Sequence, residues 1–165
     1  MIKIYEYGQV ENKEIFARMA PKANVEQIVT DIINDVKENG DAALYRYCEK
    51  FDGAKLDCLE VTKAEFDEAL AVTEPEFLRI LESAAKNIRL FHEQQKRQSF
   101  VVSGEKGALL GQRVLPIEKA GLYVPGGTAA YPSTVLMDSI PAKIAGVEEI
   151  VMVTPPSKNG KVNPA

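Results

Sequence analysis

The region of residues 120–153 constrains the fold most strongly, because its pattern passes from strand to turn to helix and back to strand. Residues 120–124 form a short apolar run without alternation, which is typical of a strand buried on both faces of a parallel sheet. After a Pro-Gly-Gly turn, a helix is predicted over residues 133–145, although Pro141 should kink or split it. Residues 150–153 predict the next strand. Such a crossover makes the two strands parallel, so the region predicts the start of a Rossmann-like β-α-β unit.

The residues before this region carry mostly helical patterns. Residues 25–36 repeat apolar side chains at the spacing of one helical face, and Asn24 is well placed as the N-cap. Gly40 can adopt the left-handed conformation that ends a helix, and Asp41 can cap a second one. The second helix has its own apolar stripe in residues 44–51. We therefore predict two consecutive helices here.

Two further segments have the form of a capping box, in which a threonine and a glutamate satisfy free backbone amides at a helix start. The first joins Thr62 to Glu65, and the second joins Thr73 to Glu76. From Thr73 a long amphipathic helix is predicted to about Lys96, because apolar side chains recur along one side of it.

A β-hairpin is predicted after the long helix. Residues 100–102 and 108–117 have strand character, and the glycine-rich residues 104–107 between them are typical of a turn. The predicted fold class is therefore α/β, in two parts. A helix-rich amino-terminal region with a β-hairpin covers residues 1–119, and the start of an incomplete α/β domain covers residues 120–165.

The last three residues favour a chain that continues. Asn163 and Pro164 are the usual opening of a helix, with asparagine as N-cap and proline in the first turn, yet the sequence stops at Ala165. This pattern predicts that the chain is a truncated fragment of a longer protein.

Composition and charge narrow the function classes. The 165 residues are 45% hydrophobic and 27% charged, which is ordinary for a water-soluble globular protein. The net charge is −4 and the basic residues are scattered, so no nucleic-acid partner is expected. No apolar run approaches the roughly 20 residues that span a bilayer, and no signal peptide is evident, so we expect no membrane partner and a cytoplasmic location. Cys48 and Cys58 are not expected to form a disulfide.

The turn after the first parallel strand is the one candidate binding motif. Gly126 and Gly127 lie where a strand passes into a helix, so backbone amides there can approach an anionic or nucleotide ligand. Tyr123 ends the strand and offers a flat ring and a hydroxyl. The pattern is not the G-x-G-x-x-G fingerprint, however, and the alternative is a turn without a ligand beside a tyrosine that only fills space.

Residues that carry chemistry are otherwise scarce. His92 is the only histidine and lies beside the apolar stripe of the long helix, where a hydrogen-bonded structural role is the natural interpretation. The sequence has no nucleophile elbow, C-x-x-C or P-loop motif. We therefore predict no catalytic residue and no metal ligand in this chain.

The segment from Ala120 to Val147 closely resembles a signature segment of histidinol dehydrogenases. Further similarities lie around His92, in residues 40–44 and 51–53, and in the last three residues. The resemblance therefore covers nearly the whole chain.

This resemblance implies the chemistry of that family. Its members are homodimers, well over twice as long as this chain, which oxidise L-histidinol through an aldehyde to L-histidine with two NAD molecules and one zinc. In the family, a tyrosine that matches Tyr123 contacts NAD, and residues that match Pro125, Gly126 and Gly127 form the adjoining loop. The resemblance implies cofactor binding at these four positions, whereas the zinc ligands and catalytic residues fall beyond Ala165.

Two functional hypotheses follow. In the first, the chain is the amino-terminal part of this oxidoreductase of histidine biosynthesis and is inactive by itself. In the second, it is a folding or dimer-contact module that binds no cofactor. Titration of the chain with NAD separates the two.

Overall fold

The computed structural model describes residues 4–15, 25–126 and 130–165, and the chain divides into two compact units. The first unit is Met1–Ala43 and the second is Leu44–Ala165. The two-domain boundary that the sequence predicts falls inside the second unit and stays a prediction. None of the helices in the described ranges is long and apolar enough to cross a membrane.

The first unit contains helix α1 (Asn12–Ile15), helix α2 (Val25–Asn39) and the beginning of helix α3 (Asp41–Tyr47). Helix α2 confirms the predicted helix, whereas its predicted cap, Asn24, lies outside the described residues. Gly40 has a φ of 55° and separates α2 from α3, as predicted. Side chains of the apolar stripe of α2 remain about half exposed: Val25, Ile28, Val29 and Ile33.

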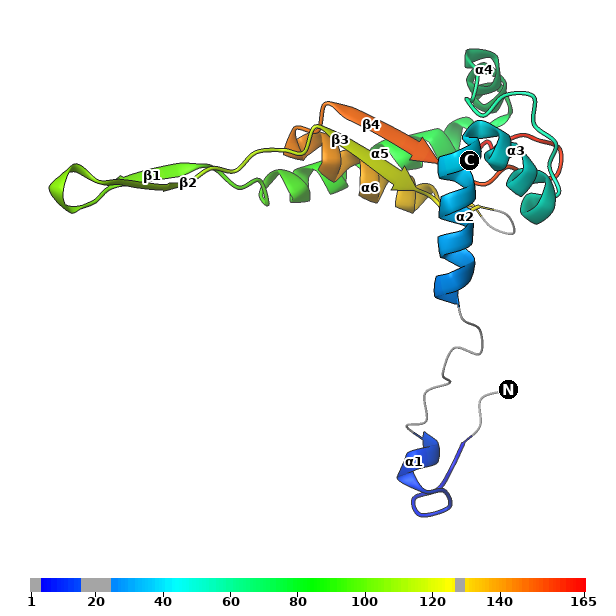
Figure 1. The fold of residues 1–165 in the computed structure, drawn as a ribbon, viewed down its shortest axis with the longest axis horizontal. Helices are drawn as coiled ribbons and strands as arrows, with labels where there is room; N and C mark the ends of the chain where they lie inside the picture. The colour runs from blue at the N-terminus through cyan, green and yellow to red at the C-terminus, as the bar shows by residue number, and fades with distance from the viewer. Residues whose placement is uncertain (1–3, 16–24, 127–129) are drawn as a thin grey trace. The chain divides into compact units, whose positions relative to one another are not determined.

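The second unit begins with the end of α3 and a π-helical turn, Cys48–Asp52. The ring of Phe51 in this turn stacks on that of Tyr47 at the end of α3, with 5.5 Å between the ring centroids. Helix α4 (Lys63–Val72) and helix α5 (Pro75–Glu93) follow (Figure 1).

The predicted capping box at the start of α4 is confirmed. The Thr62 amide donates to Glu65 Oε2 at 2.8 Å, and the Glu65 amide donates to Thr62 Oγ1 at 3.3 Å. The second predicted capping box is wrong, because Thr73 Oγ1 donates back to the Ala69 carbonyl at 2.7 Å and so belongs to the end of α4. Helix α5 starts instead at Pro75, whose fixed φ suits the first turn.

The predicted hairpin is present. Strands β1 (Phe100–Ser103) and β2 (Leu109–Gln112) pair antiparallel, and Glu105–Gly107 forms the turn between them. Strand β2 is shorter than predicted. Beyond it the Val114 amide donates to Ser99 Oγ at 2.9 Å, so a side chain takes over from the backbone ladder.

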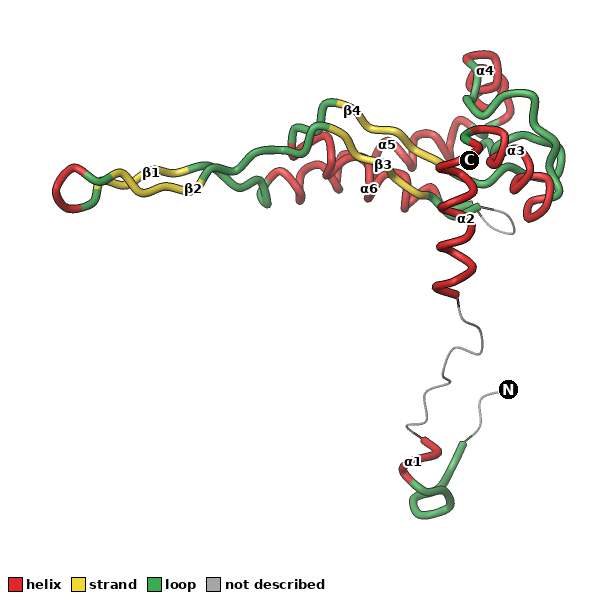
Figure 2. Tube along the Cα trace, viewed as in Figure 1, coloured by secondary structure: helices red, strands yellow, loops and turns green. Residues whose placement is uncertain are grey.

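The strand–helix–strand unit is also present. Strand β3 (Lys119–Tyr123) pairs parallel with strand β4 (Glu149–Val153), and helix α6 (Pro132–Ala145) connects them. The helix continues through Pro141, so the predicted split does not occur, and it ends at Ala145 with Gly146 as its C-cap at a φ of 94°. These elements confirm the predicted α/β class and its parallel β-α-β start (Figure 2).

The prediction of a strand buried on both faces is wrong for this chain. Alternate residues of a strand point to opposite faces, and in β3 Ala120 and Leu122 are half-buried whereas Tyr123 is 64% exposed. The half-buried face has a helical layer, because α6 packs against β3 and α5 packs against α6 (Figure 1). Among the described residues of the second unit the other face lacks such a layer, and Val151 and Val153 are exposed with Tyr123.

Candidate functional site

The carboxyl ends of β3 and β4 meet at one edge of the strand pair. The parallel ladder extends one step past β3, where the amide of the buried Val124 donates to the Val153 carbonyl at 2.9 Å. Two loops therefore leave the sheet side by side, one through Pro125 and Gly126 and one through Thr154 and Pro155. In open α/β sheets this edge is where ligands bind.

A cavity of about 180 Å³ lies at this edge. Pro125 and Gly126 line it from the first loop, Tyr131 and Val135 from the start of α6, and Met152 from β4. Its other polar groups come from the carboxyl-terminal segment of residues 154–165: Thr154, Ser157 and Asn163. The cavity thus combines apolar walls with hydroxyl and amide groups, which is the usual make-up of a small-molecule site.

Gly126 is tightly packed against the second loop. A methyl group at this position would lie 3.1 Å from the Pro155 carbonyl oxygen and 3.2 Å from Thr154 Oγ1. Both distances are shorter than ordinary contacts of a Cβ, so the two loops can approach this closely only with glycine here. Glycine at this position therefore allows the two loops to pack closely, in addition to the ligand approach that the sequence suggests.

The structure separates Tyr123 from this cavity. Tyr123 lies in register with Val153 on the exposed face of the strand pair, whereas the cavity opens beside α6 on the other face. Of the four predicted cofactor positions, Pro125 and Gly126 come together in the cavity, and Tyr123 lies at the same edge on the opposite face. Gly127 lies outside the described residues.

The segment after β4 folds back on itself beside the cavity. The Ser157 amide donates to the Lys161 carbonyl at 2.8 Å, which closes a turn through Gly160. Further on, Asn163 Oδ1 accepts a hydrogen bond from the Ala165 amide at 2.9 Å. An asparagine N-cap makes the same bond at a helix start, as the sequence suggests for this position.

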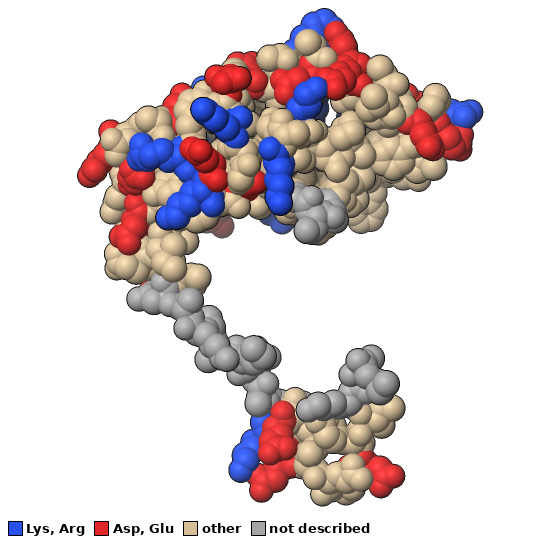
Figure 3. All heavy atoms as spheres, turned by 90° about the vertical axis from the view of Figure 1, so that its right-hand side faces the viewer, with Lys and Arg blue, Asp and Glu red and all other residues tan. Residues whose placement is uncertain are grey.

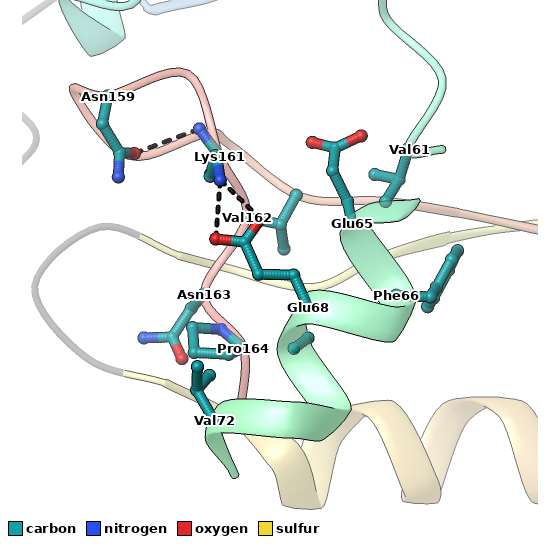
Figure 4. Close-up of a pocket in the computed structure, with 11 residues that line it drawn as sticks. Val61, Glu65, Phe66, Glu68, Val72, Asn159, Lys161, Val162, Asn163 and Pro164 are labelled. Atoms are coloured by element: carbon teal, nitrogen blue, oxygen red, sulfur yellow. Dashed lines mark hydrogen bonds and ion pairs between the residues drawn. The ribbon is translucent and has the colours of Figure 1, made fainter. Parts of the chain in front are cut away.

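A second cavity of about 320 Å³ lies between this segment and helix α4 (Figure 4). Phe66 and Val72 line it from the helix, and Val162 and Pro164 line it from the segment. At its rim, Lys161 Nζ lies 2.7 and 2.5 Å from the two carboxylate oxygens of Glu68, as the dashed lines in Figure 4 show.

Glu65 lies on the same helix and lines the second cavity. Its pKa lies below the ordinary value, first because the Thr62 backbone amide donates to it, then because of the Thr62 hydroxyl, with a further contribution from the charge of Lys161. Glu65 and Lys161 thus line the same cavity.

Sequence reasoning does not identify Tyr131, Ser157 or Lys161 as site residues. For Thr154 a signal exists, because it directly follows the second predicted strand, at the edge where ligands bind. Nothing local marks Ser157 and Lys161, since their place depends on how the carboxyl-terminal segment folds back, and Tyr131 enters the cavity from the N-cap of α6.

The remaining reactive side chains form no catalytic group in the part of the chain that the structure describes. His92 is half-buried on α5, and its Nδ1 lies 2.7 Å from Gln95 Oε1, with which it shares a hydrogen bond. Cys48 and Cys58 are both free, and burial, then the charge of Asp52, raises the pKa of the Cys48 thiol. Within the described ranges no three His, Cys, Asp or Glu side chains could hold a metal ion together.

Charged side chains of both signs lie intermixed on the face drawn in Figure 3, where Lys and Arg lie among Asp and Glu. This face carries no stripe of one sign. Elsewhere, an ion pair joins neighbouring strands, since Lys119 Nζ lies 2.6 Å from Glu149 Oε2.

Comparison with known proteins reveals similarity over most of the chain. A family model described as histidinol dehydrogenase matches residues 17–165. The histidinol dehydrogenase of Geobacillus kaustophilus is 54% identical over 132 residues, which are 80% of this chain and 31% of that protein. The histidinol dehydrogenase of Clostridium acetobutylicum is 42% identical over 170 residues, which cover 100% of this chain and 39% of that protein.

A solved structure agrees with these matches. The crystal structure of histidinol dehydrogenase from Elizabethkingia anophelis matches with a TM-score of 0.84 and 36% identity, covering 89% of this chain and 34% of that chain. The chain thus spans 31–39% of the length of the relatives and the structure described here. The resemblance that the sequence suggests is confirmed.

Proposed function

Because the chain belongs to the histidinol dehydrogenase family, we propose that it is the amino-terminal part of an enzyme that oxidises L-histidinol to L-histidine. The match of the family model to residues 17–165 carries this proposal. The parent enzyme is proposed to be a cytoplasmic homodimer of histidine biosynthesis that uses NAD and zinc. Its substrate, cofactors and partners are part of the proposal, because the chain spans about a third of its relatives.

The carboxyl edge of β3 and β4 is the proposed NAD region. Hydroxyl and amide groups of Tyr131, Thr154 and Asn163 suit the ribose hydroxyls and phosphate oxygens of a dinucleotide. A cavity of about 180 Å³ is smaller than the roughly 300–1,000 Å³ of complete ligand pockets, so it holds only part of the dinucleotide. We assign to Tyr123, which lies in register with Val153 on the opposite face of the same edge, a contact with another part of the dinucleotide.

The chemistry itself is assigned to residues outside this chain. NAD, when bound, accepts a hydride from the substrate. The zinc does not fit the residues present, because the sequence has one histidine and the described part of the chain shows no cluster of metal-ligating side chains. This chain is therefore proposed to supply part of the surface that binds NAD, with Tyr123, Pro125, Gly126 and Gly127 as its contacts. Its residues are proposed to take no part in proton transfer.

A second candidate function is a folding or dimer-contact module without cofactor binding. The apolar side chains on the exposed face of the strand pair, Val151 and Val153, favour it, because such surface normally packs against another layer.

The test begins with the 165-residue chain, purified from a host that lacks its own histidinol dehydrogenase. Mixed with zinc, NAD and histidinol, it should produce no NADH, whereas the full-length enzyme should. Sustained NADH production that scales with the amount of the chain would contradict the assignment. Titration of the same chain with NAD then separates cofactor binding from the module without a cofactor.

A further inference from the structure

We propose that Glu68 is a positioning residue for the cavity at the carboxyl edge, acting through Lys161 and the segment of residues 157–164. This inference rests on the proposed NAD region and names a residue of helix α4 that shapes it from a distance. Glu68 itself lines the second cavity and does not line the first.

The segment of residues 157–164 forms a wall shared by the two cavities. Val162 and Asn163 line both the cavity at the carboxyl edge and the cavity against α4. Figure 4 shows Val162 on the side of the segment that faces helix α4, whereas the Asn163 side chain points away from the helix. A displacement of this segment away from α4 therefore changes the shape of the first cavity as well.

The ion pair between Glu68 and Lys161 holds this wall to α4. Its partners are 93 residues apart in sequence, and both carboxylate oxygens of Glu68 accept from the ammonium group. A longer contact of 3.4 Å, from Thr73 Oγ1 to the Pro164 carbonyl, joins the same two segments at the end of the helix. The side chains of Lys161 and Glu68 are about half exposed, so the pair makes a modest contribution that salt weakens.

The backbone of Lys161 transmits this restraint to the loops. Its carbonyl accepts from the Ser157 amide at 2.8 Å, and its amide donates to Asn159 Oδ1 at 3.1 Å. The turn follows directly from Thr154 and Pro155, which pack on Gly126. The lysine ammonium group thus pairs with α4 while the lysine backbone belongs to the turn that borders the proposed NAD region.

The ion pair between Lys63 and Asp67 supplies the matched control. It lies on the same helix with a nitrogen–oxygen distance of 3.0 Å, but it joins residues four apart and touches neither the segment nor either cavity. Its loss should leave NAD binding unchanged.

Charge reversal is the sharpest test, because Glu65 lines the same cavity as Glu68 and Lys161. If Glu68 were only made neutral, Glu65 would still offer Lys161 a carboxylate. In the full-length enzyme, Glu68→Lys and Lys161→Glu should each raise the KM for NAD about two- to fivefold, the range for a part-exposed ion pair, with little change in kcat. The double variant Glu68→Lys/Lys161→Glu should restore the KM, and Lys63→Glu should match the wild type.

The rate of trypsin cleavage after the exposed Lys158 measures how firmly the segment of residues 157–164 is held, independently of NAD binding. Both single variants should be cut faster than the wild type, and the double variant should return to the wild-type rate. Unchanged cleavage would overturn the restraint on the segment, and faster cleavage with an unchanged KM would overturn its link to the NAD region. A wild-type enzyme without NAD-dependent turnover would instead refute the proposed function.

Discussion

Replacement of Gly126 by alanine should disturb the proposed NAD region through a single methyl group. The new Cβ would lie 3.1 Å from the Pro155 carbonyl oxygen and 3.2 Å from Pro155 Cγ and Thr154 Oγ1, so these neighbours must retreat by a few tenths of an ångström. Overpacking typically costs about 1–3 kcal/mol, and one methyl group belongs at the lower end, about 1 kcal/mol. If the displaced loop is the one that contacts NAD, the same energy corresponds to about a fivefold rise in the KM for NAD.

The assay compares the KM for NAD and the thermal unfolding midpoint of full-length Gly126→Ala with those of the wild type and of Gly121→Ala. Gly121 lies on β3, and a Cβ there has no described neighbour within 4 Å, so its replacement is the matched control. A lower unfolding midpoint with an unchanged KM would show that the glycine serves only loop packing, and would refute the placement of the cofactor. Unchanged values for both measurements would refute the close packing itself.

Three further changes test other parts of the structure. Thr62→Ala removes the N-cap of α4 and should lower the free energy of unfolding by about 1 kcal/mol, measured by denaturant unfolding, whereas an unaltered value would contradict the capping box. The lowered pKa of Glu65 means that its stabilising contribution is present above the unfolded pKa and lost as pH falls through the lower folded one. Glu65→Gln should therefore weaken the acid-induced loss of amide-exchange protection in α4, and an identical pH profile would count against it. His92→Gln should change the unfolding midpoint more than turnover, and a large loss of turnover at a constant midpoint would assign His92 to catalysis.

Local sequence signals predict the elements of this fold well. The capping box of Thr62 and Glu65 and the left-handed Gly40 depend on neighbours within a few residues, so the sequence alone suffices to predict them. Thr73 shows the limit of such signals. Its hydroxyl can bond either to the helix before it or to the helix after it. In the structure it donates to the Ala69 carbonyl of α4, the helix before it.

Features that depend on distant segments could not be predicted. An apolar run such as that of β3 indicates a strand with two covered faces, but among the described residues of the second unit only one face has a helical layer. The packing of Gly126 on Pro155 and the pairing of Glu68 with Lys161 likewise require the folded path of the carboxyl-terminal segment. For the same reason, the resemblance suggests four cofactor positions as one group, whereas the structure places Tyr123 and Gly126 on different faces of one sheet edge.

A crystal structure of the full-length enzyme with NAD tests the proposed cofactor region most directly. The account predicts that the dinucleotide lies across the carboxyl edge of β3 and β4, within about 4 Å of the Tyr123 ring and of the Gly126 backbone. It also predicts that the zinc ligands lie outside residues 1–165. NAD bound without contact to Tyr123, Pro125 or Gly126 would contradict the account.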